Sequence, residues 1–139
     1  IGAKNAMKLA INEAGIDPEK VDYINTHGTS TPIGDVAEVK AIQELFGEHA
    51  YNIHLTSSKS MTGHLLGATG AVEAIISLLS MQHGMVTPTI NHEAGDEDTK
   101  IDYKLNFTFN QAQARNIRYA MSNNFGFGGH NACLLFKKL

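Results

Sequence analysis

The sequence predicts an α/β domain, and three observations support this class. Segments with apolar residues at helical spacing alternate with short apolar runs that have the length of strands. The short runs end in polar, glycine-containing segments, as in layered α/β proteins. The chain has 139 residues, of which 42% are hydrophobic, so it is long enough to bury a core. We therefore expect one domain over residues 1–139, with a mixed sheet covered by helices.

The first half of the chain is predicted to form a helix, a strand, a second helix and a second strand, in this order. Helical spacing predicts a helix over 3–14, and an alternating apolar run predicts a strand over 21–26. Thr31-Pro32 is a typical helix start, which predicts a helix over 33–46, and 53–56 is a second short strand. The buried stripe expected on the second helix consists of Ile33, Val36, Ala37, Ala41 and Leu45.

The segment 63–83 is apolar on nearly every face and predicts a buried helix. Its polar residues form a narrow stripe, made of Thr69, Glu73, Ser77 and Ser80. Glu73 is the only acid there, and a buried carboxylate needs a partner. We expect Lys59 or a histidine to supply one.

The last third contains an irregular stretch and a closing hairpin. Residues 85–103 lack periodicity, and the acidic segment 93–98 is expected to be a solvated surface loop. Two strands are predicted over 117–123 and 132–136, joined by 124–131.

Charge and cysteine content exclude several kinds of protein. The net charge of −3 and the lack of a basic run argue against nucleic acid as a partner. The one cysteine rules out an internal disulfide framework and fits the cytoplasm. The apolar segment 65–81 is too short to span a bilayer, so no membrane association is expected. The absence of an initiator methionine and of a signal pattern indicates a piece of a longer protein.

Two loops carry the candidate catalytic residues. His27 follows the strand 21–26, and Lys59 and His64 follow the strand 53–56. Loops at the ends of neighbouring strands meet at one edge of a sheet, where α/β proteins build sites. A histidine whose pKa is lowered by burial and a nearby lysine stays neutral and donates one N–H. Two such donors aimed at one oxygen would form an oxyanion hole.

A metal site and a cysteine hydrolase are the competing interpretations. Four histidines are candidate metal ligands, but none stands in a ligand spacing: His27, His64, His92 and His130. Cys133 lies in an apolar strand, where a thiol usually behaves as a small buried hydrophobe. We therefore expect no metal and no nucleophile among these residues.

The glycine-rich segment 126–129 could bind a phosphate or could position the two aromatic rings beside it. It is followed by no helix, which argues against a phosphate cradle. Phe125 and Phe127 interleave with the glycines, and the rings could either pack in a core or gate an apolar tunnel. The residues alone leave both readings open.

Taken together, three motifs resemble those of the β-ketoacyl-[acyl-carrier-protein] synthases, nearest the type II condensing enzymes of bacterial fatty-acid synthesis. The motifs are Asn25-Thr26-His27-Gly28-Thr29-Ser30-Thr31-Pro32, Lys59-Ser60-Met61-Thr62-Gly63-His64-Leu65-Leu66-Gly67 and Asn124-Phe125-Gly126-Phe127-Gly128-Gly129. The resemblance covers essentially the whole chain. It implies a thiolase-like fold, of which this chain is the C-terminal half with a mixed five-stranded sheet covered by helices.

The resemblance also implies roles for individual residues. His27 and His64 match the two catalytic histidines, Lys59 the lysine that organises the site, and Glu73 an acid of the same network. The matching substrate-binding residues are Thr29 and Thr31, which hold a phosphopantetheine arm, and the aromatic residues Phe125 and Phe127, the latter as a gating ring. Many members have threonine where this chain has His130.

The implied activity is decarboxylative Claisen condensation of an enzyme-bound acyl group with malonyl-carrier protein in fatty-acid elongation. The family's acyl-bearing cysteine lies in the half that this chain lacks, so Cys133 is not its equivalent and the chain alone is expected to be inactive. Acyl carrier protein and a second copy of the full-length enzyme are the implied partners, and no cofactor is implied. A polyketide-synthase ketosynthase domain and a non-catalytic chain-length partner are the alternatives.

Overall fold

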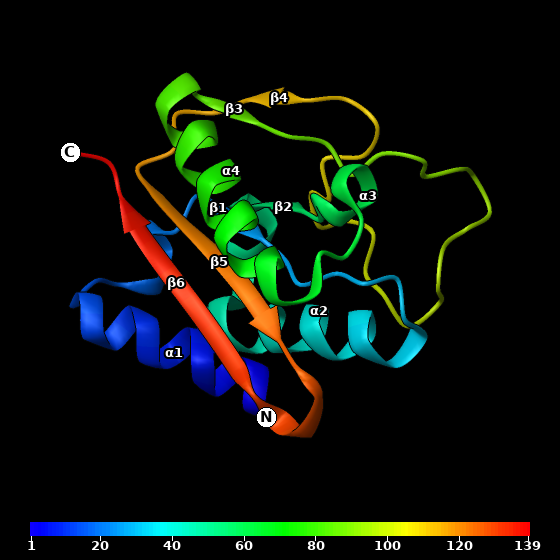
Figure 1. Cartoon of the computed structure of the whole chain (residues 1–139), viewed down its shortest axis with the longest axis horizontal. Helices are drawn as coiled ribbons and strands as arrows, with labels where there is room; N and C mark the ends of the chain where they lie inside the picture. The colour runs from blue at the N-terminus through cyan, green and yellow to red at the C-terminus, as the bar shows by residue number, and fades with distance from the viewer.

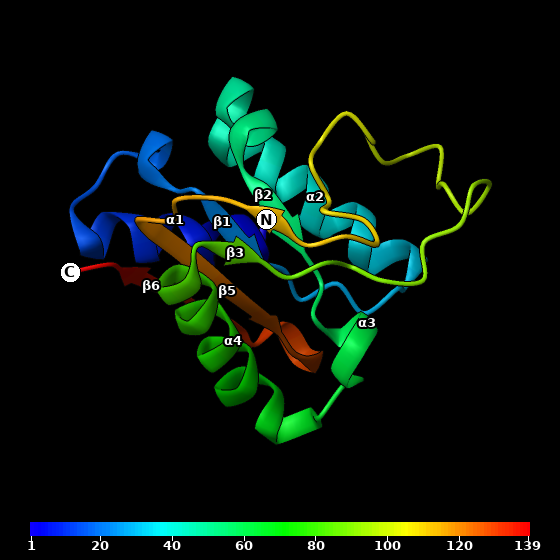
Figure 2. The ribbon, with the colours of Figure 1, turned by 90° about the horizontal axis from the view of Figure 1, so that it is seen from above.

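A four-stranded mixed sheet lies between two layers of helices in the computed structural model, which describes residues 1–139 (Figures 1 and 2). The strand order is β2 (His54–Thr56), β1 (Tyr23–Asn25), β5 (Tyr119–Phe125) and β6 (Asn131–Lys137). Strand β1 is parallel to both β2 and β5, whereas β6 is antiparallel to β5. The carboxyl ends of the three parallel strands therefore open at one edge, as the sequence predicts.

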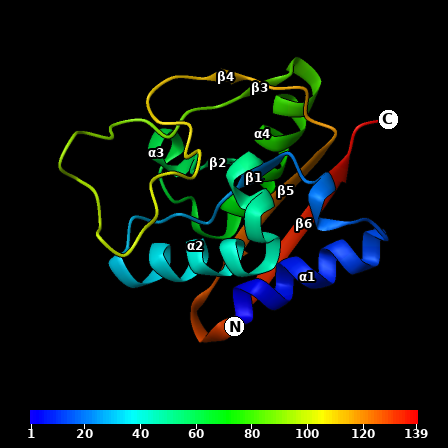
Figure 3. The ribbon, with the colours of Figure 1, turned by 180° about the vertical axis from the view of Figure 1, so that it is seen from behind.

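Helices α1 (Gly2–Ala14) and α2 (Pro32–Phe46) cover one face of the sheet (Figure 3). The larger core lies between them and the strands, and it includes Met7, Ile11, Ile42, Ile24 and Met121. The buried stripe of α2 was predicted only in part. Ile33 and Ala37 are exposed, because the inward face runs through Val36, Glu38, Val39, Ala41, Ile42 and Phe46 instead.

Helix α4 (Thr69–His83) covers the opposite face. A smaller core lies beneath it, made of Tyr23, Met81, Val86, Ile117 and Ala120. The predicted polar stripe of α4, from Thr69 to Ser80, is its buried side. Its apolar residues Ile75, Leu78 and Leu79 are exposed on the outer side.

The helix predicted over 63–83 starts later than expected. Residues Lys59–Thr62 form a single helical turn, α3, which ends at Gly63 with φ of 72°. A left-handed backbone at Gly63 breaks the helix, and α4 begins only at Thr69. The intervening segment contains the 3₁₀ turn Leu66–Ala68. The apolar run hides this break, because hydrophobicity continues through residues 65–68.

The main sheet has four strands, so the prediction of five was wrong. Asn106 pairs with His54 at the free edge of β2 as an isolated parallel bridge. The chain cannot extend that pairing, because Thr108 and Asn110 have positive φ values of 52° and 59°.

A small second sheet includes the first residues of the region 85–103, which was predicted to be irregular. It pairs β3 (Met85–Val86) with β4 (Gln113–Ala114), antiparallel. The remaining short 3₁₀ helices are Pro18–Lys20, Gly47–Asn52 and Phe127–Gly129. No helix is both long and apolar enough to cross a membrane.

Candidate active site

His27 lies just beyond the end of β1, and a buried acid of α2 fixes its backbone. Glu38 accepts the His27 N–H at its Oε1 and the Gly28 N–H at its Oε2, each at 2.9 Å. The amide of Asn123 on β5 donates to the same Oε1 at 3.1 Å. Burial raises the pKa of Glu38, and these donors partly offset the increase. The role of Glu38 was not predicted, although an acid beside apolar positions in an amphipathic helix is a usable signal.

The loop carrying His27 is joined to the loop carrying Lys59. The Ser57 hydroxyl donates to the Gly28 carbonyl at 2.6 Å, and the Thr26 N–H donates to the Thr56 carbonyl at 2.7 Å. Gly28 has a φ of 34°, and a Cβ there would lie 2.8 Å from the Ser57 Cβ. Only glycine fits such an approach, so the two loops form one packed unit.

Lys59 and Glu73 form a buried ion pair across α3 and α4. The Lys59 Nζ lies 2.6 Å from the Glu73 Oε1, and the side chains are only 5% and 1% exposed. Burial raises the pKa of Glu73, whereas the Lys59 ammonium lowers it. The expectation that this acid finds a lysine partner is confirmed. Asn124 donates to the other Glu73 oxygen at 3.5 Å.

His64 has a defined orientation beside this pair. Its Nδ1 accepts the Leu66 N–H at 3.1 Å and lies 3.0 Å from the Thr69 hydroxyl. Since Nδ1 is the acceptor, the proton of the neutral ring is on Nε2. That N–H is the one available for a substrate.

The two histidine rings meet. The centroids of His27 and His64 are 5.6 Å apart, with an interplanar angle of 85°. Burial, followed by the charges of Lys59 and His64, lowers the pKa of His27 to about 4. His27 is therefore neutral at neutral pH and can act as an N–H donor, as the sequence analysis expects.

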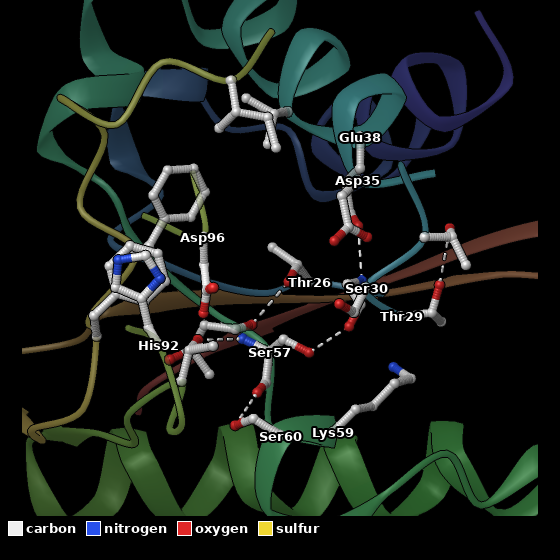
Figure 4. Close-up of a pocket in the computed structure, with 18 of the residues that line it drawn as sticks. Thr26, Thr29, Ser30, Asp35, Glu38, Ser57, Lys59, Ser60, His92 and Asp96 are labelled. Atoms are coloured by element: carbon white, nitrogen blue, oxygen red, sulfur yellow. Dashed lines mark hydrogen bonds between the residues drawn. The ribbon is translucent and has the colours of Figure 1, made fainter. Parts of the chain in front are cut away.

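A cavity of about 680 Å³ opens beside Lys59 and His64 (Figure 4). Thr29 and Thr31 line it, with their hydroxyls 3.3 Å apart. His27 does not line this cavity and reaches the site through its contact with His64.

The two phenylalanines of the glycine-rich segment are placed differently. The ring of Phe125 lies 5.7 Å from the ring of His27. Phe127 is fully exposed at the tip of the β5–β6 hairpin.

Of the four histidines considered as metal ligands, only His27 and His64 have rings in contact. His92 stacks on Phe109 with ring centroids 3.8 Å apart, and His130 lies in the exposed hairpin tip. No group of three or more His, Cys, Asp or Glu side chains is placed to hold a metal ion. Burial and the nearby Glu38 charge raise the pKa of Cys133 to about 12, which leaves its thiol protonated.

Comparison with known proteins relates this arrangement to one family. The family described as "Beta-ketoacyl synthase, C-terminal domain" matches residues 1–93. The 3-oxoacyl-[acyl-carrier-protein] synthase 2 of Staphylococcus aureus (strain COL) is 53% identical over 137 residues, which cover 99% of this chain and 32% of the relative. The enzyme of the same name from Synechocystis is 48% identical, with coverage of 99% and 32%. The chain thus spans about a third of these relatives.

Solved structures agree with the sequence comparison. A β-ketoacyl synthase from Burkholderia phymatum superposes with a TM-score of 0.90 at 39% identity, covering 99% of this chain and 32% of that one. A type II polyketide ketosynthase in complex with its acyl-carrier protein gives a TM-score of 0.92 at 33% identity, covering 99% and 33%. These likenesses confirm the expected thiolase-like α/β fold. The chain belongs to the β-ketoacyl synthase family and corresponds to its C-terminal domain.

Proposed function

We propose that the intact protein containing this chain is a 3-oxoacyl-[acyl-carrier-protein] synthase of fatty-acid elongation. One observation carries the proposal: two histidine rings in edge contact stand beside a buried Lys59–Glu73 pair at a cavity. The names of the relatives at 53% and 48% identity support the same activity. The reaction is a decarboxylative Claisen condensation between an enzyme-bound acyl group and malonyl-carrier protein.

The two histidines stabilise the charge that decarboxylation creates. Loss of CO₂ from a malonyl thioester leaves an enolate whose oxygen needs N–H donors. His64 offers its Nε2–H, and His27, neutral because of its lowered pKa, offers a second donor. The enolate carbon then attacks the acyl thioester carbonyl, and the enzyme thiolate leaves.

The Lys59–Glu73 pair helps to set the protonation state of His27. Burial and, after it, the Lys59 ammonium lower the pKa of His27, which keeps that ring from taking up a proton. Glu73 in turn neutralises Lys59 within the buried layer. Lys59 and Glu73 therefore act on the histidines rather than on the substrate carbon.

The substrate reaches the site on the phosphopantetheine arm of acyl carrier protein, so no separate cofactor is needed. Thr29 and Thr31 hold the arm from the cavity wall. We assign Phe125, which lies beside His27, and the exposed Phe127 of the hairpin tip to the acyl side. The carrier protein seen with the polyketide ketosynthase supports this partner. We place the intact enzyme in the cytoplasm as a homodimer, without nucleic acid or membrane as partners.

The nucleophile belongs to another part of the intact protein, and residues 1–139 form the C-terminal ketoacyl synthase domain. Two features support this division. The half-buried Cys133 thiol, whose raised pKa keeps it protonated, is unsuited to carry the acyl group. The exposed residues Ile75, Leu78 and Leu79 of α4 form an apolar face that suits packing against a further domain.

The test is decarboxylation of malonyl-carrier protein by the intact enzyme. His27→Ala and His64→Ala should each slow it by about 10²–10³-fold, because each removes one oxyanion donor. Acyl transfer to the enzyme should remain largely intact. His83→Ala, at the exposed end of α4, is the matched control and should behave as the unchanged enzyme. Normal decarboxylation in both histidine variants would refute the proposal.

A polyketide ketosynthase is the second candidate, favoured by structural neighbours such as the ishigamide ketosynthase/chain length factor, with a TM-score of 0.90 at 33% identity. Product analysis distinguishes the two: repeated condensation without reduction would indicate polyketide synthesis. A non-catalytic chain-length partner is the third candidate. The complete set of His27, His64, Lys59 and Glu73 argues against it.

A further inference from the structure

The cavity has an aromatic wall that the residues of the proposed reaction do not explain. We call residues 90–110 the strap. Four of its rings line the cavity: His92, Tyr103, Phe107 and Phe109. Figure 4 shows His92 on the side opposite Thr29 and Ser30, with Ser57 and Ser60 between them. The cavity therefore has a hydroxyl wall and an aromatic wall.

The strap rings form one continuous cluster. His92 stacks on Phe109 at 3.8 Å and 13°, and Phe109 lies 5.5 Å from Phe107 at 26°. Tyr103 lies 5.6 Å from Phe107 and 6.2 Å from both His92 and Phe109. Rings packed on one another lose little freedom when a ligand arrives, so the wall is preorganised.

Hydrogen bonds and one buried side chain anchor the strap at two places. Asn110 donates its amide to the His92 carbonyl at 2.7 Å and accepts the His92 N–H at 3.1 Å. Leu105 is buried in the main core, and the Asn106 carbonyl accepts the Leu55 N–H at 2.8 Å. Asn110 does not line the cavity, so it can affect a ligand only through the position of the strap.

The lining suits a chain that carries amide groups. Aromatic rings line the strap side, and hydroxyls predominate on the wall opposite the strap. Aromatic faces and hydroxyls together match flat, polar amide groups. The lining carboxylates of Asp96 and Asp98 accept backbone N–H groups of their own loop, at 3.2 Å from Glu93 and 2.9 Å from Lys100.

We propose that the strap is the second wall of the substrate channel, and that Phe107 and Phe109 contact the amide-bearing arm that carries the malonyl group. The strap then determines which thioesters are accepted, without taking part in the chemistry. This inference rests on the proposed function, because it assigns the cavity to that substrate.

Two malonyl thioesters of different arm length test the proposal on the intact enzyme. Malonyl-pantetheine carries the long arm, whereas malonyl-N-acetylcysteamine carries only its last amide. Phe107→Leu and Phe109→Leu should raise KM for the long probe by about three- to tenfold, the size of one aromatic contact. KM for the short probe and kcat for both should stay within about twofold of the unchanged enzyme. Tyr119→Leu, an aromatic residue outside the cavity, is the matched control.

Asn110→Ala tests the strap without touching its rings. It should reproduce the selective rise in KM for the long probe, and normal kcat on the short probe shows that the variant is folded. An equal effect on both probes, or none on either, would overturn the assignment. If the unchanged enzyme decarboxylates neither probe, the proposed function fails, and the assignment of the strap fails with it.

Discussion

Glu38 holds the backbone of His27 from within helix α2, at 2.9 Å from Oε1 to the His27 nitrogen. The acid is fully enclosed, and its second oxygen binds the Gly28 N–H. The position of a proposed catalytic ring thus depends on a side chain that never faces the substrate carbon. Four predictions follow from this and related contacts.

Glu38→Gln should destabilise the protein and slow decarboxylation. An amide has one acceptor oxygen, so either the His27 or the Gly28 N–H loses its partner. An unpaired buried group costs about 1–3 kcal/mol, which urea unfolding would measure. Glu44→Gln on the exposed side of α2 is the control and should change stability by less than about 1 kcal/mol. Equal effects of the two substitutions would contradict the role of Glu38.

Lys59→Met should destabilise the intact enzyme far more than the double variant Lys59→Met/Glu73→Leu. The single change leaves a buried carboxylate without its cation, which costs about 3–5 kcal/mol. Replacing both partners removes the charge altogether. The cost of Lys59→Met should shrink as the pH falls, because the raised pKa of Glu73 lets it take up a proton. Urea unfolding at several pH values checks both statements, and a cost independent of pH would contradict the second.

Gly28→Ala should disrupt the site more than Gly15→Ala. Both glycines have positive φ, of 34° and 63°. A Cβ at Gly15 meets nothing within 4 Å, so that change costs only backbone strain of about 1 kcal/mol. A Cβ at Gly28 would lie 2.8 Å from Ser57 and push the two loops apart. Thermal unfolding and decarboxylation assays separate the two outcomes, and equal losses would contradict the close packing of the loops.

Acidification should lower the free energy of unfolding, because the folded protein holds His27 in its neutral form. Its pKa is lowered to about 4, below the ordinary value near 6.5, so the unfolded chain binds the proton first. The stabilising contribution is therefore fully present above about pH 6.5 and is lost as the pH falls towards 4. The difference in unfolding free energy between the unchanged enzyme and His27→Gln should fall across this window. A difference that rises or stays constant would show that His27 is not held neutral.

Local patterns predicted the parts of the site that depend on strand ends. His27, Lys59 and His64 each follow a short apolar strand, and parallel strands bring such loops together. The partner of Glu73 was also predictable, because an isolated acid in an apolar helix requires a cation.

The remaining features depend on contacts between distant residues. Glu38 binds Asn123, which lies 85 residues away in the sequence, and no local spacing signals that pair. The strap rings come together through the bridge between Thr89 and Phe109 and through the Asn110 clamp. The start of α4 was missed because apolar residues continue across the break at Gly63.

Helix α4 carries Glu73 on its inner side and the apolar residues Ile75, Leu78 and Leu79 on its outer side. A domain that packed on the outer side would therefore contact the same helix that holds Glu73 of the Lys59–Glu73 pair. If the further domain proposed above packs on this side, a substitution at Leu78 should lower activity in a genetic screen, although Leu78 does not line the cavity. Second-site suppressors of such a change should map to the opposing surface and not to the histidine loops.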